Sequence, residues 1–297
     1  MRWRRWLAAG VGAGGYFAIL KLDSATQDSS QLHSNSITTS NETTGNDSSL
    51  LHLRQFGVAV IPAAGQRFAK TILNSSDYSD FLEHRQQVRH GRHESFREST
   101  LGRYHRLAFS QQGQDAFAAF EEEIAPLVNQ FFGLDASETS AQRLSSQLIC
   151  SQRQLLVSDV DSACQFYHQD NSKKGLTLLV PLIDVDFQHG PTQLLPGTHC
   201  LTDSQPWTAR LASLHASLQA LGTVQCAARA GDVVAYDART MHRGMSNRSA
   251  IPRPVLVVRF DRRETPPPGH GVLSTCAVRV GATLVGGYAH LIRMAGL

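Results

Sequence analysis

The chain has 297 residues, of which 41% are hydrophobic and 18% charged, and this composition favours a globular protein with a sizeable core over a largely disordered one. The formal net charge is +3 and no dense run of lysine and arginine occurs, so the sequence gives no reason to expect nucleic-acid binding. The five cysteines form no CxxC pair, which excludes a zinc ribbon and a redox motif.

Residues 1–22 have the pattern of a targeting segment. Arg2, Arg4 and Arg5 make a basic start, and residues 6–20 carry no charge. This pattern predicts a secretory signal or signal anchor, and therefore a membrane-associated or secretory location. The stretch is short for a membrane span, which needs roughly 20 apolar residues. An organellar transit peptide and a start without a targeting role are the alternatives.

The segments on either side of the expected domain differ in composition. Residues 23–50 are rich in serine, threonine and asparagine and predict a flexible linker, because they cannot bury enough apolar surface to offset their ordering entropy. Residues 51–263 are expected to form one domain. Residues 264–297 begin with a proline run and continue as an apolar extension, interpreted as an element packed on the outside of the domain or as a membrane-contacting segment. Arg279 argues against a full span.

The pattern inside the domain is mainly β. Apolar spacing of three and four residues predicts a helix over Gln114–Phe132 that stops at Gly133. Short apolar runs bounded by turn residues predict strands, and their long connections favour a double-sheet jelly roll, a double-stranded β-helix, over a parallel sheet. The remaining predicted elements are a strand over 55–62, a short helix over 63–73, strands over 147–150, 176–182, 232–236 and 255–260, and a helix over 207–221.

Three residues suggest a metal site. His168 and Asp170 are two residues apart, so on an extended segment their side chains share a face. His242 follows the 232–236 strand, and a neighbouring strand could bring it back to the end of the barrel where His168 and Asp170 lie. Two histidines and one carboxylate leave coordination positions open on iron(II). Arg253 opens the next strand, where its guanidinium could pair with a carboxylate inside the barrel.

The order of five motifs resembles the phytanoyl-CoA dioxygenase family. These motifs are His168-Gln-Asp170, Gly190-Pro-Thr-Gln-Leu-Leu-Pro-Gly-Thr-His199, Gly231-Asp-Val-Val, His242-Arg-Gly and Arg253-Pro-Val. The resemblance implies a dioxygenase that depends on iron(II) and 2-oxoglutarate. It also implies that His168, Asp170 and His242 are the iron ligands, and that Arg253 holds the distal carboxylate of 2-oxoglutarate. By the same match His199 belongs to a structural turn.

One position departs from the family pattern. Family members often carry serine or threonine two residues after the second histidine, where it helps to hold 2-oxoglutarate, and here that residue is Gly244. Another side chain could replace this contact. Thr177, on the strand after Asp170, and Gln147, on the strand before it, are the candidates by position.

These observations predict a 2-oxoglutarate dependent dioxygenase that hydroxylates a small, apolar or lipid-like molecule by C–H abstraction and releases succinate and carbon dioxide. Because Asp170 is present, halogenation is disfavoured. The alternative from another class is a catalytically silent, membrane-tethered binding module on the same barrel, which Gly244 favours. The expected partners are the small-molecule substrate, dioxygen and, through residues 1–22, a membrane. The sequence predicts no oligomeric state.

Overall fold

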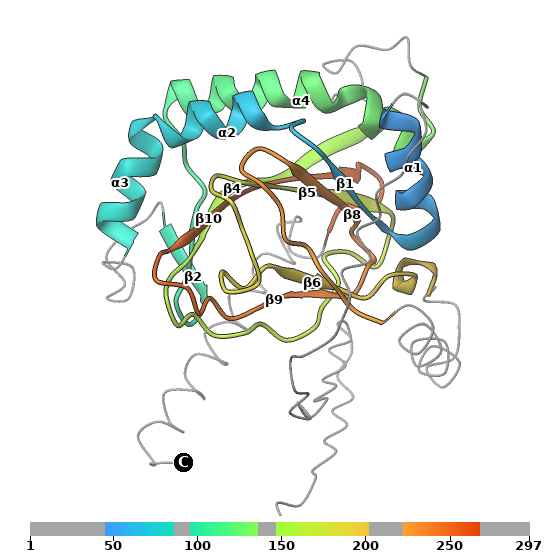
Figure 1. Cartoon of the computed structure of the whole chain (residues 1–297). Coiled ribbons are helices and arrows are strands. Elements are labelled where there is room, and N and C mark those ends of the chain that lie inside the picture. The colour runs from blue at the N-terminus through green and yellow to red at the C-terminus, as the bar shows by residue number, and fades with distance from the viewer. Residues whose placement is uncertain (1–44, 86–95, 136–146, 202–221, 268–297) are drawn as a thin grey trace, which may run out of the picture.

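The computed structural model describes residues 45–85, 96–135, 147–201 and 222–267. Within these residues two antiparallel sheets pack face to face, and helices cover the outer face of the larger sheet (Figure 1). The predicted double-sheet jelly roll is therefore confirmed.

The larger sheet has seven strands in the order β1-β8-β5-β10-β4-β3-β2, and every neighbouring pair is antiparallel. Strand β5, between β8 and β10, is buried along its whole length because both faces are covered. The strands are β1 (Val58–Ile61), β2 (Phe96–Thr100), β3 (Arg103–Arg106), β4 (Leu148–Ser158), β5 (Gly175–Pro181), β8 (Val233–Asp237) and β10 (Arg253–Arg262).

The smaller sheet consists of β7 (Val224–Gln225), β6 (Thr192–Leu194) and β9 (His242–Gly244), in that order. A 3-10 turn, Thr198–Cys200, follows β6. Leu194 on β6 packs against the inner face of the larger sheet, so the two sheets enclose a core of their own. The candidate metal site lies in this space between the two sheets.

The alternation along β10 shows how one strand serves two cores. Leu256, Val258 and Phe260 belong to the core beneath the helices, whereas Val255 and Val257 belong to the core between the sheets. Side chains two residues apart share a face of a strand. Polar residues at the same alternate positions as Val255 and Val257 are thereby directed between the sheets, where a site can form.

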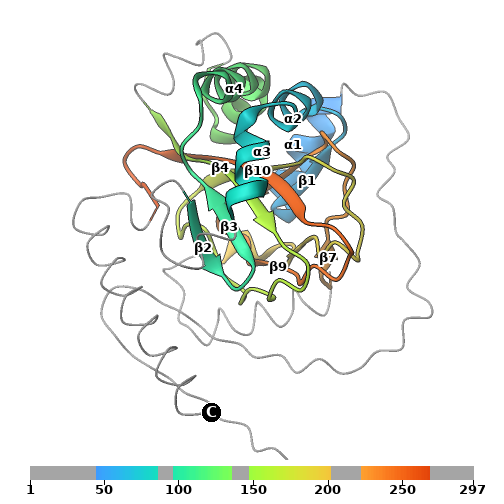
Figure 2. The ribbon, with the colours of Figure 1, turned by 90° about the vertical axis from the view of Figure 1, so that its left-hand side faces the viewer.

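Four helices accompany the sheets in the described part of the chain. They lie on the side of the larger sheet opposite β7 and β9 (Figure 2). The longest begins at Ser110, whose side chain accepts a hydrogen bond from the Gly113 amide, and it ends at Gly133 in the left-handed conformation. The helices are α1 (Gly45–Phe56), α2 (Gln66–Leu73), α3 (Ser76–His84) and α4 (Gln111–Phe132).

The predicted elements and the structure differ at several boundaries. Helix α1 begins at Gly45, inside the segment expected to be a linker, because Leu50 and Leu53 are buried against the core. Strand β4 extends to Ser158, far beyond the predicted 147–150. Its middle is polar, since alternate side chains there face the site rather than apolar neighbours, and the apolar pattern therefore ended too early.

Several predictions fall outside the described residues. These are the targeting segment 1–22, most of the linker 23–50, the helix over 207–221 and almost all of the extension 264–297. Among the residues that the structure does describe, no helix has the length and apolarity that crossing a membrane requires.

Candidate metal centre

His168 and His242 face each other across a backbone bridge. The amide of each donates to the carbonyl of the other at 2.9 Å, although His168 lies in the connection between β4 and β5 and His242 on β9. Directly opposed residues of an antiparallel bridge carry their side chains on the same face. The two imidazole rings accordingly lie with centroids 4.3 Å apart.

Each imidazole is held through its Nδ1 atom. His168 Nδ1 lies 2.9 Å from the Phe166 carbonyl oxygen, and His242 Nδ1 lies 2.9 Å from that of Thr240. A carbonyl only accepts, so each Nδ1 carries the proton and each Nε2 presents a lone pair. Burial lowers the pKa of His242 to about 4, which keeps its ring neutral at pH 7. In this tautomer Nε2 of each ring is the atom available to a metal.

Asp170 completes the set. Its amide donates to the Ala238 carbonyl, which fixes the residue beside the end of β8. Its Oδ2 atom accepts hydrogen bonds from Thr177 Oγ1 at 2.8 Å and from the Tyr236 hydroxyl at 3.1 Å. Its Oδ1 atom faces His242 Nε2 at 3.6 Å. Because Oδ2 is engaged by two hydroxyls, Oδ1 is the atom available to a metal.

The charge state of Asp170 suits a metal ligand. Burial by itself raises the pKa of this carboxyl, but the neighbouring His242, Arg259 and His168 outweigh that effect, so the pKa is lowered. The ligand atoms of His168, Asp170 and His242 all lie within 4.8 Å of one another. Two neutral imidazoles and one carboxylate at this spacing fit iron(II) with open coordination positions.

Arg259 is a cation beside this cluster. It extends from β10 so that its Nη1 atom lies 3.6 Å from Asp170 Oδ1. Its Nε atom donates to Asp261 Oδ2 at 3.0 Å and lies 3.1 Å from Ser151 Oγ. The buried Asp261 offsets the charge of Arg259, so the guanidinium can remain close to a metal ligand without a net positive charge at this position.

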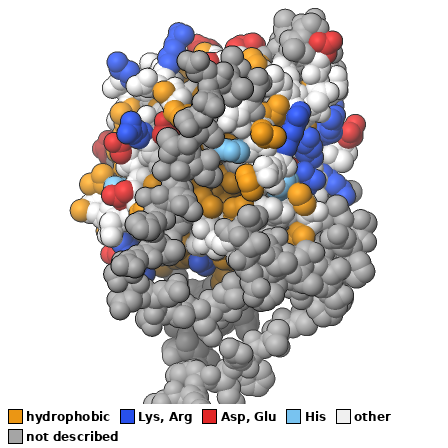
Figure 3. Space-filling model, turned by 45° about the vertical axis from the view of Figure 1, so that its right-hand side comes forward, with side chains coloured by type: hydrophobic (Ala, Val, Ile, Leu, Met, Phe, Trp, Pro, Cys, Tyr) orange, Lys and Arg blue, Asp and Glu red, His pale blue; other side chains and the backbone are white. Residues whose placement is uncertain are grey.

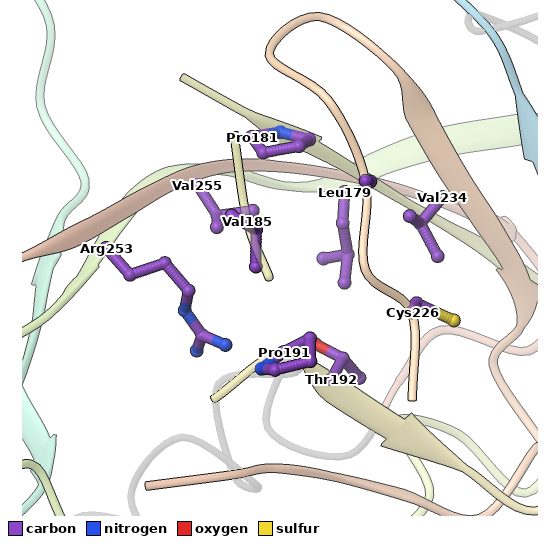
Figure 4. Close-up of a pocket in the computed structure, with 10 residues that line it drawn as sticks. Leu179, Pro181, Val185, Pro191, Thr192, Cys226, Val234, Arg253 and Val255 are labelled. Carbon is purple, nitrogen blue, oxygen red and sulfur yellow. The ribbon is translucent and has the colours of Figure 1, made fainter. Parts of the chain in front are cut away.

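Arg253 lies inside the barrel, at the opposite end of β10 from Arg259. It extends from the strand toward Pro191 and Thr192, in a pocket otherwise lined mainly by apolar side chains (Figure 4). The guanidinium donates to the Gly190 carbonyl and, through Nη2, to Ser158 Oγ at 3.0 Å. Its Nε atom is buried and has no hydrogen-bond partner within the described residues. The pocket therefore holds an unsatisfied cationic donor.

A second buried arginine shares that environment. Arg103 on β3 is fully buried, and its Nη1 donates to the same Ser158 Oγ at 2.6 Å. Burial, and then the charge of Arg103, lower the pKa of Arg253 to about 9. Neither arginine forms an ion pair with a carboxylate in the part of the chain that the structure describes. Two buried cations without a counterion fit a site for a carboxylate ligand.

Arg103 also explains Gly244. A β-carbon at Gly244 would lie 2.7 Å from Arg103 Nη1 and 2.7 Å from Gln165 Oε1, so a side chain there would require these two groups to move. The guanidinium of Arg103 thus fills the space beside β9 where the family pattern has a serine or threonine. At the position where Gly244 departs from the family pattern, the structure therefore has the cationic side chain of Arg103 from β3.

The other predicted site residues lie as follows. Thr177 reaches the centre, but its hydroxyl donates to Asp170 Oδ2. Gln147 is not brought to the centre: it is exposed on a turn before β4, and its carbonyl accepts from the Arg263 amide. His199 is buried in the turn after β6, with Nε2 3.1 Å from the Arg54 carbonyl oxygen, as expected of a structural residue.

Sequence reasoning missed Arg103, Tyr236 and Arg259. Tyr236 and Arg259 both lie inside predicted strands, at positions that alternate toward the space between the sheets, and that alternation was the signal that could have found them. Arg103 offered no comparable signal because β3 is short and polar.

Comparisons with known proteins agree with this geometry. The profile of the phytanoyl-CoA dioxygenase (PhyH) family matches residues 53–255, more than half of the chain. The chain is similar in fold to AviO1 from Streptomyces viridochromogenes Tue57, at 18% identity and a TM-score of 0.56, with 76% of this chain and 99% of that chain covered.

Two further solved structures share the fold. The non-heme alpha ketoglutarate dependent carbocyclase SnoK from nogalamycin biosynthesis has 19% identity and a TM-score of 0.51, covering 79% of this chain and 94% of that chain. The epimerase SnoN from the same biosynthesis has 20% identity and a TM-score of 0.50, covering 72% and 82%. At these identities the likeness shows the fold alone, so the activity class rests on the family match and on the triad. The chain belongs to the phytanoyl-CoA dioxygenase family and is a 2-oxoglutarate dependent dioxygenase with an iron-binding triad of two histidines and one aspartate.

Proposed function

We propose that the protein hydroxylates a C–H bond of a small molecule and releases succinate and carbon dioxide. The observation that carries this proposal is the presence of Asp170 with His168 and His242, their ligand atoms within 4.8 Å of one another. A carboxylate in this position completes the protein ligands of the metal, which favours hydroxylation over halogenation.

Different residues of the centre would bind the metal and orient its ligands. Nε2 of both histidines and Oδ1 of Asp170 would hold iron(II), and Thr177 and Tyr236 fix the carboxylate through Oδ2. Iron bound there supplies the redox chemistry that couples decarboxylation of 2-oxoglutarate to oxidation of the substrate. Such outer hydrogen bonds orient the ligands and are important for metal affinity.

Arg253 and Arg103 would hold the distal carboxylate of 2-oxoglutarate. Both guanidiniums are buried, both contact Ser158, and Arg253 Nε has no partner among the described residues. A carboxylate bound between them would supply the missing counterion and acceptor. Charge-assisted hydrogen bonds of this kind contribute about 1.5–3 kcal/mol each.

An apolar substrate is supported by the surface near the triad. Phe166, two residues before His168, is 75% exposed. Figure 3 shows hydrophobic side chains gathered on one face of the described surface. Exposed apolar area of this kind often marks a binding site. We therefore include an apolar or lipid-like substrate in the proposal.

The test is iron-dependent formation of succinate in the presence of candidate substrates. His168→Ala and Asp170→Ala should abolish it, because each removes a metal ligand. His52→Ala is the matched control, since His52 lies on α1 and contacts Phe56 rather than the triad. Turnover retained in either triad variant would refute the assignment.

The alternative function, a catalytically silent binding module, is no longer favoured by Gly244. Gly244 suggested a lost co-substrate contact, but Arg103 occupies the space in question. Iron and 2-oxoglutarate binding, measured separately by calorimetry, distinguishes the two functions. A silent module should bind neither tightly, whereas the dioxygenase should bind both.

We also propose that residues 1–22 direct the protein to a membrane or the secretory pathway, that residues 23–44 connect them to the domain, and that residues 264–297 form an extension. The basic and then uncharged start of the chain supports this proposal. Imaging a C-terminal fluorescent fusion with and without residues 1–22 tests it. An unchanged distribution would refute the targeting role, and a mitochondrial or plastid pattern would favour the transit peptide.

A further inference from the structure

We propose that Tyr236 is an oxidisable member of the metal centre, and that its ring is converted to a catechol when the protein consumes 2-oxoglutarate without its substrate. The inference rests on the proposed dioxygenase function. It adds a modification site that lies within the protein itself.

The first support is the position of the phenol. Tyr236 is only 3% exposed, and its hydroxyl oxygen lies 3.1 Å from Asp170 Oδ2 and 3.2 Å from His242 Nε2. Its ring centroid lies 4.6 Å from that of His242. The phenol thus contacts two of the three metal ligands at once.

The second support is the proton balance of the site. His242 Nδ1 donates to the Thr240 carbonyl, so Nε2 is an acceptor, and Asp170 Oδ2 is an acceptor as well. The single phenol proton cannot serve both atoms. A metal bound to Nε2 resolves this conflict, because the lone pair of Nε2 is then used by the metal and the proton goes to Asp170 alone.

The third support is distance. Metal–imidazole bonds are about 2.1 Å long. A metal on His242 Nε2 therefore lies at most about 5.3 Å from the phenol oxygen, since that oxygen is 3.2 Å from Nε2. The ring carbons next to the hydroxyl carry the C–H bonds that lie nearest to this oxygen.

Tyr167 provides a contrast within the same part of the fold. It is adjacent to His168 in sequence, but its hydroxyl lies 2.7 Å from Gln193 Oε1 and the Arg243 guanidinium stacks 4.4 Å from its ring centroid. Its phenol is thus engaged away from the triad. Proximity in sequence to a metal ligand is therefore not enough, and of these two tyrosines Tyr236 is the one that should be modified.

The chemistry balances with the co-substrates that the enzyme already uses. One oxygen atom of dioxygen enters the ring C–H bond next to the hydroxyl and gives a catechol. The other oxygen atom enters succinate as 2-oxoglutarate loses carbon dioxide. Two electrons come from the ring and two from 2-oxoglutarate, so dioxygen is fully reduced and no further reductant is needed.

The first experiment needs no turnover. Binding of Co²⁺ to the full-length protein is measured for the wild type, Tyr236→Phe and Tyr167→Phe. Loss of the hydrogen bond to Asp170 should weaken Co²⁺ binding by Tyr236→Phe about 10-fold. Tyr167→Phe should bind as the wild type does. Equal affinities in all three proteins would show that the Tyr236 hydroxyl does not contribute to the centre.

The second experiment detects the modification. The protein is incubated with iron(II), 2-oxoglutarate and oxygen but no substrate, then digested and analysed by mass spectrometry. We expect the peptide carrying Tyr236 to gain one oxygen atom. Once excess dioxygen has oxidised the bound iron(II), the intact protein should develop the visible absorption of a ferric catecholate. Tyr236→Phe should lack that absorption, and Tyr167→Phe should retain it.

The outcomes separate the two proposals. Succinate formed without an oxygen on Tyr236, or with oxygen on another residue, overturns the Tyr236 proposal and leaves the dioxygenase function intact. The absence of both succinate and modification overturns the Tyr236 proposal as well, and the dioxygenase function is then decided by its own assay with substrates.

Discussion

The Arg103 guanidinium occupies the space that a side chain at Gly244 would need: a β-carbon on Gly244 would lie 2.7 Å from Arg103 Nη1. The pair links β9 of the smaller sheet to β3 near the edge of the larger one. A small residue and a large buried cation thus depend on each other, which is testable by a double-mutant cycle.

Gly244→Ala should displace the Arg103 guanidinium and lower the free energy of unfolding by about 1–3 kcal/mol, the usual cost of overpacking. Gly244→Ala should cost less in an Arg103→Ala background, because the space has been cleared. Denaturant unfolding of the four proteins measures the coupling. Strictly additive effects would contradict a direct contact.

Arg253→Met and Arg103→Met should each raise the KM for 2-oxoglutarate about 10- to 100-fold, since each removes charge-assisted hydrogen bonds of about 1.5–3 kcal/mol. The stabilisation of the protein by 2-oxoglutarate in thermal unfolding should fall in parallel. Arg67→Met, at an exposed position on α2, is the control. If Arg103→Met left 2-oxoglutarate affinity unchanged, the second cation would have another role.

Thr177→Val should weaken metal binding about 10-fold, because it deletes the 2.8 Å hydrogen bond to Asp170 Oδ2 at nearly constant volume. Thr177→Ser keeps the hydroxyl and should restore the affinity. Titration with Co²⁺ measures both variants. The reverse result, normal metal binding with weaker 2-oxoglutarate binding, would support the direct co-substrate contact predicted from sequence.

The metal-free protein should lose stability as the pH falls from about 6.5 toward 4. Burial lowers the pKa of His242 to about 4, whereas in the unfolded chain histidine titrates near its usual 6.5. The unfolded state therefore binds a proton first, and the protein becomes less stable through that window by about 3 kcal/mol in total. The pKa of Asp170 is lowered, so protonation of this carboxyl reduces the free energy of unfolding only at more acidic pH.

Urea unfolding of metal-free protein across this pH range measures the slope. His242→Gln removes the titrating group and should flatten the dependence. A similar slope in wild type and variant would assign the pH dependence to other groups.

Much of the candidate centre was predictable from sequence because its signals are local. Two ligands two residues apart share a face, and the second histidine and Arg253 follow a strand and open the next one. The apolar runs of β5, β8 and β10 likewise predicted the sheet. Helix α1 and the polar half of β4 were missed, since their buried residues do not form a continuous apolar pattern.

Only the tertiary structure decided what surrounds the ligands. It brings Arg103 from β3 to the space beside Gly244, and it places Tyr236 and Arg259 against Asp170. These contacts join strands that are neighbours in the barrel but distant in the chain. The sequence by itself indicated the family through the order of five motifs, the jelly roll through its apolar runs, and the three candidate ligands through that resemblance. The second cation and the phenol depend on strand pairing and on the packing of two sheets, which no local pattern specifies.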